Sequence, residues 1–215
     1  MTRHIPNLLT VGRFFLAIAF FIIVGFYDPA APAGWPVLDV AFVLFLVGVS
    51  TDMVDGYVAR KYQAQSAFGR IADPFVDKII VCGALAYFIG DTFSVVPEAA
   101  SAALNLTGWQ PWMVVLILGR ELLVTGMRSF SESHGIPFAA SWSGKVKMIL
   151  QCTAICWTLF YVAHWVDGPG WSADPAWTQT VRDALIWGTV VFTALSGLAY
   201  VQRAYHLLRL PPEEA

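Results

Sequence analysis

Two short segments of this 215-residue chain carry four aspartates, Asp52, Asp55, Asp73 and Asp77. Within each segment the two aspartates are three or four residues apart, so a helix would place both on one face. The link between the segments, residues 61–68, is short enough to make two such helices antiparallel neighbours. We therefore expect all four carboxylates to lie at one depth, about two helical turns from the helix ends that border the link.

Four carboxylates in apolar surroundings need a positive partner, because an unpaired charge costs several kcal/mol there. Carboxylate oxygens suit Mg²⁺ or Mn²⁺, which also bind phosphate oxygens. Room for two ions would suit phosphoryl transfer, in which metals stabilise both the attacking and the leaving oxygen. A proton or ion relay in a cation transporter would use the same residue types, and spacing alone leaves that alternative open.

The composition around these segments predicts that they lie in a membrane. Apolar residues make up 57% of the chain and charged residues 13%, against about a quarter charged in an ordinary soluble domain. Apolar stretches near the ~20 residues that cross a bilayer recur along the chain. They cover residues 8–26, 37–59, 72–90, 112–127, 144–166 and 181–207. We predict an all-α integral membrane protein in which residues 1–215 form one domain of six transmembrane helices.

The first of these stretches has a second interpretation, because basic residues precede it as they precede the apolar part of a signal peptide. Its 19 residues are nevertheless long enough to span a bilayer. We therefore favour a transmembrane helix over a signal peptide for residues 8–26.

The placement of basic residues predicts the orientation. If the N-terminus is cytoplasmic, every Lys and Arg except Arg182 falls on or near the cytoplasmic side, and the opposite loops carry only acidic charges. Tryptophans gather at the opposite ends of the spans, as in an interfacial belt: Trp35, Trp109, Trp112, Trp165, Trp171 and Trp177. We expect a multi-pass protein of the cell (inner) membrane, with both termini and the aspartate site cytoplasmic.

Small and basic residues stand at fixed distances from the aspartates. Residues 52–77 read D-x2-D-G-x2-A-R-x8-G-x3-D-x3-D, and the additional fixed positions are Gly56, Ala59, Arg60 and Gly69. Alone, the small residues would equally suit close helix packing. Together with the aspartates, however, the segment resembles the signature of the CDP-alcohol phosphatidyltransferase family at every specified position and at both gap lengths.

The resemblance implies a six-helix CDP-alcohol phosphotransferase fold, usually dimeric, with two metal ions, Mg²⁺ or Mn²⁺. It implies that Asp52, Asp55 and Asp73 bind the metals and the CDP diphosphate. Asp77 would also touch metal and act as the general base. The remaining positions would shape the CDP pocket: Gly56, Ala59, Arg60 and Gly69.

Three further patches resemble the branch of this family that uses glycerol 3-phosphate as acceptor, the phosphatidylglycerophosphate synthases. They are residues 5–10 with Arg13, residues 119–121 with Arg128, and residues 141–147 with Gln151. Met148 departs from the threonine expected after the second lysine. This departure weakens the assignment of the acceptor more than that of the chemistry.

Basic residues of these patches could bind a phosphorylated acceptor by charge-assisted hydrogen bonds. An arginine inside a predicted span needs a partner, and Arg120 has Glu121 beside it. We expect the acceptor phosphate to contact Arg120, Arg128, Lys145 and Lys147. For Lys145 and Lys147, snorkelling to lipid phosphates under the positive-inside rule explains the charge equally well.

The expected reaction is transfer of the phosphatidyl group of CDP-diacylglycerol to glycerol 3-phosphate, which gives phosphatidylglycerophosphate and CMP. Two other acceptors stay open within the family: phosphatidylglycerol, as in a cardiolipin synthase, and an inositol phosphate. Outside the family, a cation transporter would need carboxylates nearer the middle of the membrane. The later spans offer only Glu121, so we place that alternative last.

Overall fold

The computed structural model describes the backbone of residues 5–29, 36–62, 67–96, 103–133, 142–166 and 176–209. Within these ranges it describes the side chains of residues 11–29, 36–51, 78–96, 103–131, 142–166 and 176–202. Six long α-helices account for most of the described chain: α1 (Ile5–Gly25), α2 (Val37–Tyr62), α3 (Ala67–Phe88), α4 (Pro111–Ser133), α5 (Trp142–Tyr161) and α6 (Ala176–Arg209). A π-helical turn, η3 (Val162–Val166), continues α5.

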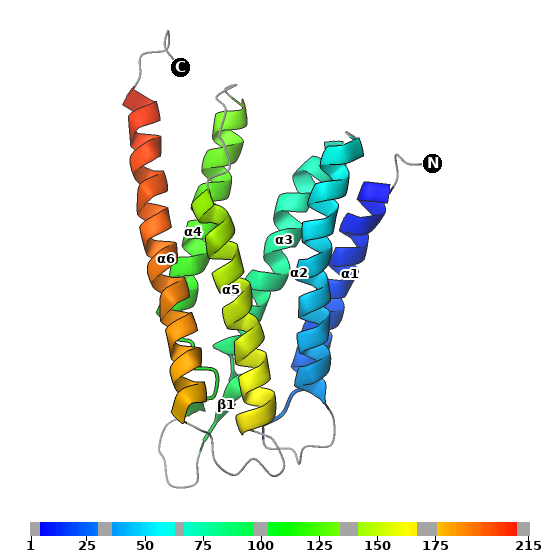
Figure 1. Cartoon of the computed structure of the whole chain (residues 1–215), viewed down its shortest axis with the longest axis vertical. Coiled ribbons are helices and arrows are strands. Elements are labelled where there is room, and N and C mark those ends of the chain that lie inside the picture. Colours follow the sequence, from blue (N-terminus) through cyan, green and yellow to red (C-terminus); the bar gives the residue numbers. More distant parts are fainter. Residues whose placement is uncertain are drawn as a thin grey trace.

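The helices stand side by side in one bundle (Figure 1). The start of α1 and the end of α6 lie at the same end of this bundle, where α2 also ends and α3 begins. We call this the site end. The opposite, hairpin end carries the short helix η2 (Asp91–Phe93) and the strands β1 (Ser94–Val95) and β2 (Leu104–Asn105), which pair antiparallel. The predicted all-α class is confirmed, and this small hairpin was not predicted.

Helical spacing of buried apolar residues explains how the bundle is held together. In α1 the buried positions are Ala17, Phe20 and Val24, and in α2 they are Leu38, Ala41 and Phe45. These spacings of three and four residues give each helix one inward stripe. The stripes join one hydrophobic core with buried residues from the other helices, among them Leu85, Phe88, Ile117, Ile155, Leu159 and Ile186.

Apolar side chains also cover the outside of the bundle. Leu122 of α4 is 73% exposed, Val115 is 66% exposed and Leu195 of α6 is 62% exposed. A helix that is apolar on its outer face as well as its inner face is typical of a membrane span. Within the described residues, two helical segments are long and apolar enough to cross a bilayer, Trp142–Val166 and Ala176–Gln202.

The number of membrane spans stays a prediction. Besides those two segments, the described residues include three shorter apolar helical segments: Val11–Gly25, Val37–Thr51 and Lys78–Phe88. The predicted tryptophan belt needs one correction, because Trp109 is only 1% exposed and is therefore a core residue. Trp112 and Trp177 are exposed, as an interfacial position requires.

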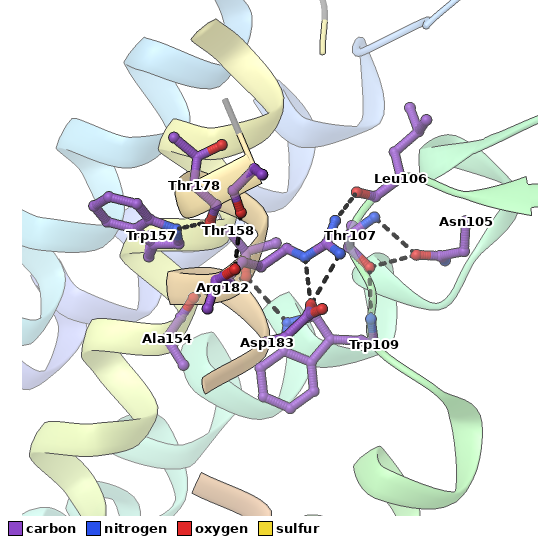
Figure 2. A network of polar contacts seen from close by, with 12 residues as sticks. Asn105, Leu106, Thr107, Trp109, Ala154, Trp157, Thr158, Thr178, Arg182 and Asp183 are labelled. Carbon is purple, nitrogen blue, oxygen red and sulfur yellow. Dashed lines mark hydrogen bonds and ion pairs between the residues drawn. The ribbon is translucent and has the colours of Figure 1, made fainter. Parts of the chain in front are cut away.

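Polar contacts at the hairpin end satisfy the buried end of α3. Figure 2 shows the part of this network around Thr107, Trp109 and Thr158. The carbonyl of Phe88, the last residue of α3, lacks an intrahelical partner. Asn105 Nδ2 donates a hydrogen bond to this oxygen at 2.7 Å, and Thr107 Oγ1 donates another at 2.9 Å. The buried Trp109 Nε1 donates to Thr158 Oγ1 of α5 at 3.1 Å. The loop before α4 is thereby tied to both α3 and α5.

Arg182 of α6 closes the same network (Figure 2). Its Nε and Nη2 both lie 2.9 Å from Asp183 Oδ1, and its Nη1 donates to the Leu106 carbonyl at 3.4 Å. Its guanidinium carbon lies 4.7 Å from the centre of the Tyr161 ring. Gly108 has a positive φ of 79°, and a Cβ there would lie 2.9 Å from Arg182 Nε. The loop therefore needs glycine at this position both for its backbone and for the space.

Close packing of α1 on α3 gives a test of the bundle. A Cβ added to Gly83 would lie 2.2 Å from Phe21 Cζ, and the Phe21 ring is stacked on Tyr87. We expect Gly83→Ala to lower the free energy of unfolding by about 1–3 kcal/mol, measured by thermal unfolding in detergent. Gly188→Ala is the matched control, because a Cβ there meets nothing within 4 Å. It should be neutral or stabilising by about 0.5–1 kcal/mol, and equal losses in the two variants would contradict this packing.

Candidate active site

The backbone places the four signature aspartates at matching depths on α2 and α3. Asp52 lies ten residues before Tyr62, the last residue of α2, and Asp77 lies ten residues after Ala67, the first of α3. At 1.5 Å per residue, both are about 15 Å from the site-end termini of their helices. By the same measure, Asp55 and Asp73 are about 10 Å from those termini. The register expected for a shared site is therefore present in the backbone.

The side chains of the signature lie outside the described residues. This applies to the aspartates and to Gly56, Ala59, Arg60 and Gly69. Elsewhere, the side chains that the structure describes contain no group of three or more His, Cys, Asp or Glu residues suited to a metal. The metal roles and the CDP-binding roles therefore stay predictions.

Beside the last aspartate, three cations converge on one carboxylate. Glu121 of α4 is 8% exposed, and its Oε1 accepts hydrogen bonds from Arg120 Nη1, at 2.9 Å, and from Lys147 Nζ of α5. Lys78 of α3, the residue after Asp77, lies with its Nζ 3.5 Å from Glu121 Oε2. Lys78 also donates to the Glu121 carbonyl at 3.0 Å and to Thr125 Oγ1. We call Lys78, Arg120, Glu121 and Lys147 the cation cluster.

Among the described side chains, the cation cluster has three positive groups and one negative group, a formal excess of two positive charges. Two of its cations are poorly hydrated, because the side chain of Arg120 is 8% exposed and that of Lys147 is 7% exposed, whereas that of Lys78 is 29% exposed. A buried excess of charge is costly unless a counter-ion is supplied. The described part of the cluster therefore has the charge to attract an anion.

Arg120 presents an open hydrogen-bonding edge in this cluster. Its Nε and Nη2 are buried and have no hydrogen-bond partner within the described part of the chain. Arg182 is a useful comparison. Its guanidinium also lies 2.9 Å from the carboxylate of the next residue, Asp183, and also lies over a tyrosine ring. In Arg182, however, Nε and Nη2 are both occupied by Asp183. Two adjacent guanidinium N–H groups match two oxygens of a phosphate or carboxylate.

Helix α6 fixes the position of the Arg120 side chain. The guanidinium carbon lies 5.2 Å from the centre of the Tyr200 ring. A Cβ on Gly197 would lie 3.3 Å from Arg120 Cγ, so the absence of a side chain there lets the arginine pass close to α6. Neither contact uses Nε or Nη2, the two buried groups that have no partner among the described residues.

The other two predicted phosphate ligands, Arg128 and Lys145, lie apart from this cluster. Arg128 is exposed on α4, eight residues beyond Arg120, which is about 12 Å along the helix. Lys145 is exposed on α5, two residues before Lys147, so the helix turns it about 200° away. The structure thus brings Arg120 and Lys147 together, while participation of Arg128 and Lys145 stays a prediction.

Three residues gain importance that the sequence did not reveal. The sequence predicts only that Lys78 lies near the cytoplasmic side, and it predicts no role for Tyr200. Gln151, which belonged to a resembling patch, is 2% exposed and its Nε2 has no partner among the described residues. Helical spacing could have flagged Gln151, which lies four residues after Lys147 and so shares its face of α5. Lys78 and Tyr200 depend on tertiary contacts.

Comparison with known proteins is consistent with this arrangement. The sequence profile of the CDP-alcohol phosphatidyltransferase family matches residues 3–195. The chain belongs to the CDP-alcohol phosphatidyltransferase family, and it is therefore an enzyme of that class. Together with its apolar helices, this membership indicates a membrane protein.

Individual relatives carry a more specific name. The chain is 30% identical over 219 residues to the CDP-diacylglycerol–glycerol-3-phosphate 3-phosphatidyltransferase of Bacillus subtilis, covering 96% of this chain and 97% of that protein. It is 31% identical over 176 residues to the proteins of the same name from Escherichia coli K12 and Salmonella paratyphi A. Those matches cover 79% of this chain and 84% of each relative.

Proposed function

We propose that this enzyme transfers the phosphatidyl group of CDP-diacylglycerol to glycerol 3-phosphate, forming phosphatidylglycerophosphate and releasing CMP. The observation that carries the proposal is the open edge of Arg120 inside a buried cluster with two excess positive charges. A phosphate monoester carries up to two negative charges and presents oxygens that fit that edge. The names of the similar proteins agree with a phosphorylated acceptor.

The cation cluster supports a phosphorylated acceptor over a neutral one. Glycerol would leave the excess charge of the cluster without a counter-ion, and this would cost binding free energy. Phosphatidylglycerol carries a single negative charge on a diester, which neutralises only half of the excess. An inositol phosphate would satisfy the charge as well as glycerol 3-phosphate does, so the names of the relatives favour glycerol 3-phosphate over it.

In the proposed reaction, Arg120 and Lys147 hold the phosphate of glycerol 3-phosphate and leave its primary hydroxyl free. Asp77 accepts the proton of this hydroxyl, and the oxygen attacks the phosphorus that bears the diacylglycerol. The bond from this phosphorus to the bridging oxygen breaks, and CMP departs with that oxygen. Lys78 belongs to the cation cluster and directly follows Asp77 in α3, and this adjacency in the chain supports a base close to the proposed acceptor site.

The residues of the signature suit the metals that this chemistry would use. Four carboxylates are hard oxygen donors, and their matching depths on α2 and α3 suit a site shared between the two helices. We propose that Asp52, Asp55, Asp73 and Asp77 hold Mg²⁺ or Mn²⁺, as two ions. Such ions, when bound, would supply positive charge to the diphosphate. Gly56, Ala59, Arg60 and Gly69 would line the CDP pocket.

The setting of the enzyme forms part of the same proposal. Six helices would cross the inner membrane, with both termini and the site end facing the cytoplasm. The helix ends at the site end agree with both termini on one side (Figure 1). The lipid substrate would then enter laterally from the inner leaflet, and glycerol 3-phosphate would enter from the cytoplasm. A homodimer is proposed from the family resemblance.

The choice of acceptor tests this function directly. With CDP-diacylglycerol and Mg²⁺, we expect the purified protein to release CMP rapidly with glycerol 3-phosphate. Glycerol should be at least about tenfold poorer in kcat/KM, because one charge-assisted hydrogen bond is worth about 1.5–3 kcal/mol. If CMP release were faster with phosphatidylglycerol or with an inositol phosphate, glycerol 3-phosphate would not be the preferred acceptor.

Metal dependence tests the aspartate site. We expect EDTA to abolish CMP release and Mg²⁺ or Mn²⁺ to restore it, because four converging carboxylates repel each other without a cation. Asp52→Asn should raise the metal concentration required for half-maximal activity. Asp39→Asn is the matched control, since Asp39 lies in the first turn of the same helix, outside the signature. Full activity in EDTA would exclude the proposed metal role.

A further inference from the structure

The carboxylate of Glu121 has an unusual position for a group beside an anion-binding site. A negative charge there should weaken binding of a phosphate, yet Glu121 is buried at the centre of the cation cluster. Its two oxygens contact cations from three different helices, which are Lys78 of α3, Arg120 of α4 and Lys147 of α5. A geometric role would explain why the chain keeps an acid at this place.

The contacts of Arg120 show what that role is. Its Nη1 is held by Glu121 Oε1 at 2.9 Å, and this leaves Nε and Nη2 as the edge without a partner in the described chain. The same carboxylate oxygen also accepts from Lys147 Nζ. One oxygen therefore sets the distance between the two cations that are proposed to hold the acceptor phosphate. Without it, two buried like charges would repel each other and separate.

The other carboxylate oxygen faces α3. Lys78 Nζ lies 3.5 Å from Glu121 Oε2 and donates to the Glu121 carbonyl at 3.0 Å. Since Lys78 directly follows Asp77, these contacts hold the α3 backbone beside the base against α4. The alignment of the acceptor with Asp77 would then depend on Glu121 as well.

We infer that Glu121 is a positioning residue, which holds Arg120 and Lys147 at the spacing that a phosphate requires and fixes them relative to Asp77 through Lys78. This inference rests on the proposed function, because it assigns the cation cluster to the acceptor phosphate. Glu121 touches neither substrate, and it acts through the cations.

The sign of the effect of Glu121→Gln separates positioning from simple charge balance. The substitution keeps the size of the side chain and raises the net charge of the cluster by one. If Glu121 only offset positive charge, KM for glycerol 3-phosphate would fall. For a positioning residue, we expect this KM to rise at least about tenfold and kcat to fall, while KM for CDP-diacylglycerol stays within about twofold. An unchanged or lower KM for glycerol 3-phosphate would overturn the inference.

Asp183→Asn is the matched control for this experiment. Asp183 also follows an arginine and also bonds it at 2.9 Å, but it lies at the hairpin end. It should leave both KM values unchanged. If Glu121→Gln does not fold, Glu121→Asp retains the charge and shortens the side chain by one methylene. Glu121→Asp should also raise KM for glycerol 3-phosphate alone, and an equal rise in both KM values would contradict positioning.

A double-mutant cycle tests whether Glu121 acts through Lys147. The fold-changes in KM for glycerol 3-phosphate should not multiply in Glu121→Gln/Lys147→Gln, because removing Lys147 already removes what Glu121 positions. If the fold-changes in KM of the two single variants multiplied in the double variant, Glu121 would not act through Lys147. The outcome is distinguishable from failure of the proposed function, in which the unmutated enzyme would not use glycerol 3-phosphate at all.

Discussion

The ion pairs of Glu121 are the interaction on which the described part of the site depends. Charged side chains are costly inside an apolar bundle, and they persist where each charge finds a partner. One carboxylate here pairs with Lys78, Arg120 and Lys147, so two positive charges stay unbalanced among the described side chains. Removing one partner of a buried ion pair lowers the free energy of unfolding by about 3–5 kcal/mol. The remaining imbalance gives the cluster its attraction for an anion.

The two ends of the bundle use one arrangement for different purposes. Arg182 and Arg120 each bond the following acid and each lie over a tyrosine ring. At the hairpin end, Asp183 and the Leu106 carbonyl occupy the Arg182 guanidinium, and the contacts close the loops onto α6. At the site end, the Arg120 guanidinium keeps Nε and Nη2 open within the described residues. The first arrangement ties loops to α6, and we propose that the second binds the acceptor phosphate.

The sequence predicted the fold class and the class of enzyme, because both depend on local patterns. Apolar stretches located the six helices with errors of up to six residues at a helix end, and the spacing of the signature aspartates agrees with the register of α2 and α3. Trp109 was taken as an interfacial residue, but it is buried by packing across the bundle, where its Nε1 donates to the Thr158 hydroxyl. The roles of Lys78 and Tyr200 were missed for the same reason. The resembling patches and their charge grouped Arg128 and Lys145 with Arg120; the described structure brings only Lys147 to Arg120, and the roles of Arg128 and Lys145 stay predictions.

A structure of the enzyme with glycerol 3-phosphate bound would show which cations hold the acceptor. We expect phosphate oxygens to accept hydrogen bonds from Nε and Nη2 of Arg120 and from Lys147 Nζ, while Glu121 keeps its bond to Arg120 Nη1. The primary hydroxyl should lie on the side of Asp77. A phosphate bound by Arg128 and Lys145, with the Arg120 edge occupied by groups of the protein, would contradict this arrangement.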